Sequence, residues 1–313
     1  MLAYVIRRIL ATIPVVILVA LFVFSLLYIS PGDPAAIIAG DQATPADVEH
    51  IRASLGLDRP YLVRFGDWFW QILHGDLGTS IFTNLPVTHM IAQRIEPTVS
   101  LMILTLIISL SLAIPMGVLA AWKHGGWIDR LVMATAVFGF STPVFVVGYL
   151  LAYFFALRLD WLPVQGFTPI GQGFWPFLRT LILPSIALGL IYMALIARIT
   201  RATMLDVLNQ DYVRTAKAKG VGQRGILYIH ALKNAAVPIV TIVGIGFAAL
   251  IGGAVVTESV FAIPGLGRLT VDAILRRDYP VIQGVVLLFS FLYVLINLGV
   301  DLLYTLFDPR IRY

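Results

Sequence analysis

The sequence contains no cysteine and few charged residues. Without cysteine the chain can form neither disulfides nor thiolate metal sites. Its five histidines show no metal-ligand spacing, so no metal site is predicted: His50, His74, His89, His124 and His230. Charged residues make up 12% of the 313 positions, whereas a soluble domain carries about a quarter. This composition excludes an ordinary soluble domain.

Motifs for nucleotide binding and catalysis are missing as well. No glycine is followed directly by lysine, which excludes a phosphate-binding loop of the Gly-x-x-x-x-Gly-Lys-Ser/Thr type. The pairs Gly244-x-Gly246 and Gly265-x-Gly267 lack the third glycine and the flanking strand of a dinucleotide site. No Gly-x-Ser-x-Gly sequence occurs. We therefore expect a protein that is not an enzyme by itself and binds no cofactor of its own.

Long apolar runs dominate the chain instead. Hydrophobic residues make up 59% of it, and the mean hydropathy is +0.91. A membrane-spanning helix needs about 20 predominantly apolar residues. Uncharged runs of about that length or longer lie between these charged pairs: Arg8 and Asp33, Glu96 and Lys123, Arg130 and Arg158, Arg179 and Arg198, Lys233 and Glu258, Asp278 and Asp301. The sequence therefore predicts an all-α polytopic membrane protein with six transmembrane helices.

An even number of spans puts both termini on one side of the membrane. If that side is the cytoplasm, most Lys and Arg fall in inner segments and most Asp and Glu in outer ones, as is typical of membrane proteins. We expect a cytoplasmic N-terminus and first helix over 1–29, and an extracytoplasmic segment over 30–96. A five-helix core follows over 97–313. The first apolar run is too long for a signal peptide, so we expect it to remain as a span.

The extracytoplasmic segment is predicted to be helical. Thr44-Pro45 is typical of a helix start and Gly56 of its end. A second helix is expected from Pro60 to about His74, because its apolar residues recur at helical spacing. This segment either meets a partner protein or packs without one. Within the core, the stretch 161–178 contains so many proline and glycine residues that a loop is expected there.

Some residues inside or beside the spans are candidates for function. Pro143 removes a helical hydrogen bond in the third span, and Ser141 and Thr142 either satisfy the freed backbone groups of a kink or line a pathway. Glu258 is ionisable at the outer membrane edge. It is either a pathway or gate residue, or a carboxylate that snorkels or pairs with an arginine. A stripe of small residues allows close helix contact, either within the chain or in a dimer: Gly244, Ala248 and Gly252.

A polar stretch interrupts the apolar pattern between the fourth and fifth spans, in a predicted cytoplasmic loop over 201–236. Asp211 is suited to cap a short helix, and Gly220 to end it in a left-handed conformation. Basic residues keep the stretch in water: Arg214, Lys217, Lys219, Arg224 and Lys233. Two alternatives are open at this point. The loop either binds a protein outside the bilayer or merely sets the topology.

Several motifs resemble the permeases of ABC importers, in the branch that carries dipeptides, oligopeptides, nickel and glutathione. The polar stretch is similar to the coupling-loop signature of that branch, which implies an ATPase-coupling role for Tyr212, Val213, Arg214, Thr215, Ala216, Lys217, Ala218, Lys219 and Gly220. The general superfamily motif has Glu-Ala-Ala where this chain has Arg214-Thr215-Ala216, a departure usual in the peptide branch. Further similar segments follow in order: Pro31–Pro34, Gly75–Ser80, His230–Pro238, Val255–Gly267, Arg277–Val281 and Asp308–Tyr313.

The resemblance implies an assembly in the bacterial inner membrane. A second homologous permease would complete the path, two cytoplasmic ATPase subunits would bind ATP and Mg²⁺, and an extracytoplasmic solute-binding protein would deliver cargo. Peptide is the expected cargo, with glutathione, nickel chelate or oligosaccharide as other possibilities within the family. The alternative is a transporter or channel driven by an ion gradient. It is disfavoured because the predicted span interiors carry no charge and no repeat is evident.

Overall fold

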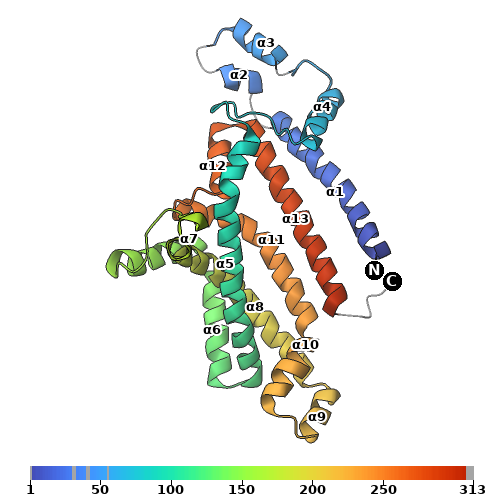
Figure 1. Cartoon of the computed structure of the whole chain (residues 1–313), viewed down its shortest axis with the longest axis vertical. Coiled ribbons are helices and arrows are strands. Elements are labelled where there is room, and N and C mark those ends of the chain that lie inside the picture. Colours follow the sequence, from blue (N-terminus) through green and yellow to red (C-terminus); the bar gives the residue numbers. More distant parts are fainter. Residues whose placement is uncertain (1, 30–32, 40–42, 55, 308–313) are drawn as a thin grey trace. The chain divides into compact units, whose positions relative to one another are not determined.

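The computed structural model describes residues 2–29, 33–39, 43–54 and 56–307 (Figure 1). The tail 308–313 and residues 31 and 32 of the Pro31–Pro34 motif lie outside these ranges. Within them the chain is helical and forms no strand beyond one isolated bridge between Thr79 and Pro86. The elements are α1 Leu2–Ile29, α2 Pro34–Ala39, α3 Pro45–Ser54, α4 Tyr61–Leu73, α5 Val87–Trp122, α6 Trp127–Ser141, α7 Val144–Leu151, π-helix η1 Ala152–Arg158, 3₁₀-helix η2 Ile170–Gln172, α8 Phe174–Leu208, α9 Asp211–Ala218, π-helix η3 Gly225–Ala231, α10 Leu232–Asn234, α11 Ala236–Val260, α12 Leu266–Arg276 and α13 Tyr279–Phe307.

The predicted polytopic architecture is confirmed, with one change in the third span. In the described part of the chain, five helices are long and apolar enough to cross a membrane: α1, α5, α8, α11 and α13. The third span is two helical pieces, 127–141 and 144–158, that meet at 104°. The prediction of one helix kinked at Pro143 is therefore wrong. A residue before proline avoids the helical region, and Thr142 accordingly has an extended backbone with ψ 124°.

One predicted boundary also moves. The expected loop 161–178 ends early, because α8 begins at Phe174 directly after Gly173, whose φ is +124°. Pro176 lies in the first turn of α8, where a missing N–H costs no helical hydrogen bond. The helix α5 begins at Val87, so residues 87–96 of the predicted extracytoplasmic segment are helical, and the division between 96 and 97 stays a prediction.

The two helices predicted outside the spans are present. In α3, the N–H of Val48 donates to the carbonyl of Thr44 at 3.1 Å, and Gly56 beyond its end has φ +60°. The helix α4 begins after Pro60 and ends before His74. The short α2 was not predicted.

The chain divides into two compact units. The first consists mainly of residues 95–268, and α8 is its central helix, with α6, α7 and α11 packed against it. Its core joins Leu183 and Leu188 of α8 to Leu250 and Ala254 of α11. The segment α9–η3 lies beyond the ends of α8 and α11 (Figure 1).

The second unit contains residues 6–94 and 269–294. Phe24 of α1 is its aromatic centre, with the rings of Tyr61, Phe65 and Trp68 from α4 at 5.3, 5.6 and 5.2 Å. The hydroxyl groups of Ser25 and Tyr61 are 2.7 Å apart. These contacts hold α4 against the C-terminal part of α1.

In this second unit, two motifs that are far apart in the sequence meet. The hydroxyl of Ser80, which closes Gly75–Ser80, donates to the carboxylate of Asp278 at 2.5 Å. The N–H of Ile81 donates to the same carboxylate at 3.2 Å. Asp278 is 4% exposed. The motif Arg277–Val281 therefore anchors the loop that leads into α5.

In the first unit, a buried ion pair joins α6 to α8. The Arg201 guanidinium donates to both carboxylate oxygens of Asp129, at 2.5 and 2.7 Å, and the N–H of Gly125 donates to Asp129 at 2.9 Å. Asp129 is 4% exposed. Removal of one partner from such a pair leaves an uncompensated charge in a poorly hydrated place.

We predict that Asp129→Ala destabilises the protein by about 3 kcal/mol, with a fall of several degrees in the apparent unfolding midpoint in detergent. Asp67→Ala is the matched control, because Asp67 pairs with Arg59 at 2.8 Å while both side chains are half exposed. An exposed pair contributes little, so the control should keep a midpoint near that of the wild type. Equal midpoints for the wild type and Asp129→Ala would show that the pair does not hold these helices together.

Candidate functional site

The predicted coupling residues form a short helix with two faces. The helix α9 begins at Asp211, with Gln210 as its N-cap residue. Asp211 therefore lies in the first turn, where its negative charge interacts favourably with the helix dipole. The expectation that Asp211 caps the helix is wrong. Val213 and Ala216 are buried, at 0% and 9% exposure. The other seven coupling residues are exposed: Tyr212, Arg214, Thr215, Lys217, Ala218, Lys219 and Gly220.

Gly220 terminates α9 as predicted. Its φ is +78°, its N–H donates to the carbonyl of Lys217 at 3.0 Å, and the next N–H, from Val221, donates to Ala216 at 3.1 Å. This pattern satisfies the last carbonyl groups of a helix and requires a left-handed residue. A Cβ at Gly220 would meet nothing within 4 Å. The requirement for glycine is therefore conformational rather than steric.

An apolar cluster fixes the predicted coupling segment, residues 211–234 from α9 to α10, to the spans. Leu227 and Ala231 of η3 pack with Met204 of α8, and the same cluster includes Ala235 and Ile239 from the start of α11. Val118 and Ala121 from the end of α5 complete it. All seven residues are buried. Because buried cores are close-packed, a displacement of this segment is transmitted to α5, α8 and α11.

The exposed surface of the coupling segment is basic. Arg214, Lys217, Lys219, Arg224 and Lys233 are all exposed there. Asp211 is the one acidic residue of α9, and it pairs with Arg214 at 3.3 Å where both side chains are exposed. Such a surface suits a partner with acidic residues.

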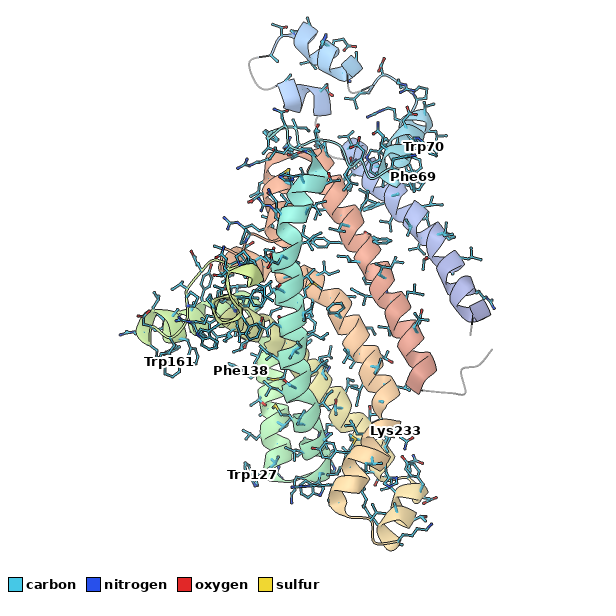
Figure 2. All side chains as sticks on the ribbon, viewed as in Figure 1. Phe69, Trp70, Trp127, Phe138, Trp161 and Lys233 are labelled. Carbon is cyan, nitrogen blue, oxygen red and sulfur yellow. The ribbon has the colours of Figure 1, made fainter. Side chains whose placement is uncertain are left out.

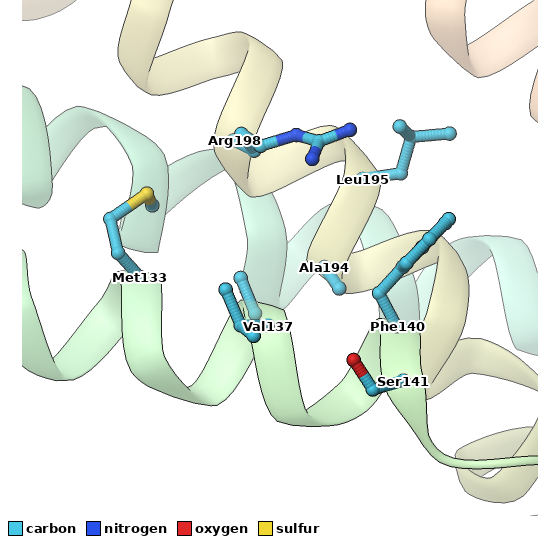
Figure 3. A pocket seen from close by; sticks show the side chains of 8 residues that line it. Met133, Val137, Phe140, Ser141, Ala194, Leu195 and Arg198 are labelled. Atoms are coloured by element: carbon cyan, nitrogen blue, oxygen red, sulfur yellow. The ribbon is translucent and has the colours of Figure 1, made fainter.

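The break in the third span lies beside a cavity (Figure 3). The cavity has a volume of about 180 Å³ and is lined by Met133, Ala136, Val137, Phe140 and Ser141 of α6 and by Ala194, Leu195 and Arg198 of α8. Thr142 supplies hydrogen bonds at the end of the broken helix, because its N–H and its hydroxyl both donate to the carbonyl of Phe138, at 3.1 and 2.8 Å. Of the predicted trio Ser141, Thr142 and Pro143, only Ser141 lines this cavity.

Arg198 is a candidate that the sequence did not reveal. Among the described residues that line this cavity it is the only charged one, and its guanidinium carbon lies 5.9 Å from the centroid of the Phe140 ring. Figure 3 shows its side chain extending toward Phe140. In the sequence, Arg198 was noted only as the end of an apolar run. Its position three residues before Arg201 was the available signal, since those two side chains share one side of a helix.

Glu258 is fully buried, at 0% exposure. Its carboxylate accepts the Thr98 hydroxyl at 2.6 Å and the backbone N–H of Arg268 at 2.9 Å, while the Thr98 oxygen accepts the N–H of Leu266 at 2.8 Å. Thus Glu258 ties α11 to α5 and to the first turn of α12. The carboxylate does not snorkel, and the Arg268 group bonded to it is the backbone N–H rather than the guanidinium.

Two glycines leave room for this carboxylate. A Cβ on Gly265 would lie 2.3 Å from the carboxyl carbon of Glu258, and one on Gly267 would lie 2.6 Å from the Cα of Val255. Gly265-x-Gly267 therefore serves a close approach of the chain to itself. The two glycines are therefore accounted for by packing, without a dinucleotide site.

The small-residue stripe on α11 is used unevenly. A Cβ on Gly244 would clash with the Val300 side chain of α13, at 2.2 Å, and Ala248 is buried. Gly252 is exposed, and a Cβ there would meet nothing within 4 Å. The stripe thus makes a tight internal contact at Gly244 and remains open at Gly252.

We predict that Glu258→Ala destabilises the protein by about 3 kcal/mol, because two donors lose their acceptor and a cavity is left. Glu258→Gln should cost less, since an amide keeps one acceptor oxygen and the shape. Ser259→Ala is the control, because the Ser259 hydroxyl bonds only its own helix at Val255. Apparent unfolding midpoints and uptake measured on the same variants separate two roles. Normal midpoints with lost uptake would identify a gate residue and contradict the structural role.

Comparison with known proteins places the chain in a family. The family described as binding-protein-dependent transport system inner membrane component matches residues 113–313, and its N-terminal region matches residues 1–102. The chain is 55% identical to a probable peptide ABC transporter permease protein of Sinorhizobium fredii, over 99% of each protein. It is 44% identical to the glutathione transport system permease protein of Salmonella typhimurium, over the full length of both.

A solved structure shares the fold. One chain of the structure described as inward facing conformations of the MetNI methionine ABC transporter superposes with a TM-score of 0.59. The match covers 70% of this chain and 96% of that chain at 16% identity. The relatives are permease subunits rather than enzymes, and the family belongs to the bacterial inner membrane. The chain therefore belongs to the family of binding-protein-dependent transport system inner membrane components, the multi-pass permease subunits of ABC importers.

Proposed function

We propose that this permease subunit carries peptides and couples to its ATPase subunits through the exposed face of α9. The apolar cluster beneath that helix is the observation that carries the coupling proposal, because it includes residues of η3, α5, α8 and α11. In this proposal α9 inserts into a groove on an ATPase subunit. When ATP and Mg²⁺ bind to the separate ATPase subunits and close them, that groove moves and α9 moves with it. The spans packed against that cluster move with it.

The proposed cargo is a peptide. The relatives named above are described as a peptide permease and a glutathione permease, and glutathione is itself a tripeptide derivative. A binding protein on the extracytoplasmic side would deliver the peptide, and both termini of this chain would be cytoplasmic. The basic surface of the coupling segment would then face the ATPase subunits, consistent with the preference of cytoplasmic loops for positive charge.

A second, homologous permease would provide the other half of the path. Exposed apolar side chains on α6 and α7 suit either lipid or that subunit: Val137, Phe138, Phe140, Phe145 and Tyr149 (Phe138 is labelled in Figure 2). The open end of the small-residue stripe at Gly252 is a further place for close helix contact. We propose that the break at Ser141, Thr142 and Pro143, together with Arg198, lies along the translocation pathway. The buried bonds of Glu258 favour a structural role over a gate.

Substitution at the end of α9 tests the coupling proposal. Gly220→Pro removes the N–H that bonds Lys217 and cannot adopt φ +78°. We expect peptide uptake by cells to fall by about tenfold or more, while the subunit still reaches the membrane, since Gly220 is exposed and lies outside the core. Gly220→Asn is the matched control, because asparagine tolerates the left-handed region, and it should retain most of the uptake.

The purified transporter gives the second readout. Stimulation of ATP hydrolysis by cargo-loaded binding protein should be lost in Gly220→Pro and kept in Gly220→Asn. Full uptake in Gly220→Pro would contradict the coupling role of α9. If the wild-type transporter hydrolyses ATP in response to binding protein loaded with a cargo other than peptide, and not with peptide, the cargo proposal is overturned while the coupling proposal stands.

A further inference from the structure

A cavity of about 480 Å³ lies within the second unit, and its described lining includes no residue of the coupling segment or of the broken third span. Leu27 of α1, Arg64, Trp68 and Gln71 of α4, and Gln283 of α13 contribute to its wall. The loop after α4 adds residues 77–81. Cavities of this size hold small ligands, and no role proposed above uses this one.

The cavity lies where the apolar part of a span ends. The apolar window of α1 is Leu10–Leu27, and its last residue, Leu27, lines the cavity. The helix α4 crosses α1 at the same level, since Phe24 contacts both Phe65 and Trp68. Tryptophan with one polar edge is typical of the boundary between hydrocarbon and headgroups. A ligand in this cavity would therefore be at the depth of a lipid headgroup.

The charge of the wall selects an anion. Arg64 is the only charged residue among the described residues that line the cavity. Its guanidinium carbon lies over the Phe24 ring, 5.8 Å from the centroid. A guanidinium has five N–H donors, so it can bond a phosphate as well as a group of the protein. Gln71 and Gln283 add amide groups that can bond a polar headgroup.

A peptide fits the same wall poorly. A free peptide carries an ammonium as well as a carboxylate, and none of the described lining residues is acidic. Two carboxylates in the motifs that build the wall lie outside its lining. Asp278 is 4% exposed and already accepts Ser80 and Ile81, and Asp76 accepts the N–H of Gly78 at 2.8 Å. The ammonium would thus have no counter-charge in the cavity.

We propose that this cavity binds the phosphate headgroup of an anionic membrane phospholipid, with Arg64 as the phosphate ligand and the acyl chains directed along α1. The lipid comes from the leaflet at the C-terminal end of α1. Because α4 and the Gly75–Ser80 loop both contribute to the wall, a bound lipid stabilises the extramembrane part of the second unit. This site depends neither on the cargo nor on ATPase coupling.

Native mass spectrometry of the purified transporter complex tests the proposal, with dioctanoyl phosphatidylglycerol as the probe. We expect Arg64→Gln to bind this lipid about tenfold more weakly than the wild type. Arg59→Gln is the matched control, because Arg59 is exposed, pairs with Asp67 and lies outside the cavity. It should bind like the wild type. Gln71→Trp fills the cavity from an exposed position on α4 and should also weaken binding, which keeps the test decisive if Arg64→Gln does not fold.

Competitors distinguish the source of the anion. Inorganic phosphate and trialanine should not displace the lipid at the concentrations at which unlabelled phosphatidylglycerol does. Displacement by phosphate as effective as that by lipid would make this a free-anion site and overturn the proposal. Displacement by trialanine that depends on Arg64 would make it a cargo site, with the same consequence. Wild-type lipid binding in both Arg64→Gln and Gln71→Trp would show that the lipid binds elsewhere.

Discussion

Inside a bilayer every backbone N–H and C=O must find its partner within the protein, and the rest of this structure depends on that constraint. It explains why the spans are helices and why each irregularity carries its own polar solution. At the break in the third span, the N–H and hydroxyl of Thr142 converge on the carbonyl of Phe138. Between α11 and α12, Glu258 and Thr98 accept the N–H groups that the turn leaves free. Side chains thus supply the hydrogen bonds that the backbone cannot.

Local signals made several elements predictable. The left-handed end of α9 at Gly220 and the extents of α3 and α4 follow from residues within one or two turns of each other. The position of proline relative to a helix start does not. Pro176 removes no helical hydrogen bond in the first turn of α8, whereas Pro143 ends a helix by restricting Thr142. The residues around the two prolines do not show which one breaks a helix, because that depends on where the helix begins.

Contacts between distant residues were beyond reach of a single sequence. Ser80 and Asp278 lie in two recognisable motifs, but nothing near either residue indicates that they meet. Glu258 was singled out because it is ionisable, although its partners, the Thr98 hydroxyl and the N–H of Arg268, are revealed only by packing. Arg198 was overlooked because a charge at the end of an apolar run was taken as a boundary. In the structure it lies against the broken span.

Packing in the first unit joins the coupling segment to the proposed pathway. The exposed, basic face of α9 is available to a partner, its buried face holds η3, and η3 shares one apolar cluster with three spans. α8 extends from that cluster to the wall beside the break in the third span. A push on the coupling segment therefore reaches the proposed pathway through one continuous helix.

Site-specific crosslinking tests the coupling contact most directly, because a chain without native cysteine permits unique labelling. Lys217→Cys in the exposed face of α9 would carry a maleimide–benzophenone label in the intact transporter, with Trp175→Cys, exposed at the start of α8, as the control. If α9 contacts the ATPase, we expect a light-dependent adduct with an ATPase subunit from position 217 and none from position 175. Labelling of ATPase from both positions, or from neither in a transporter that hydrolyses ATP, would contradict it.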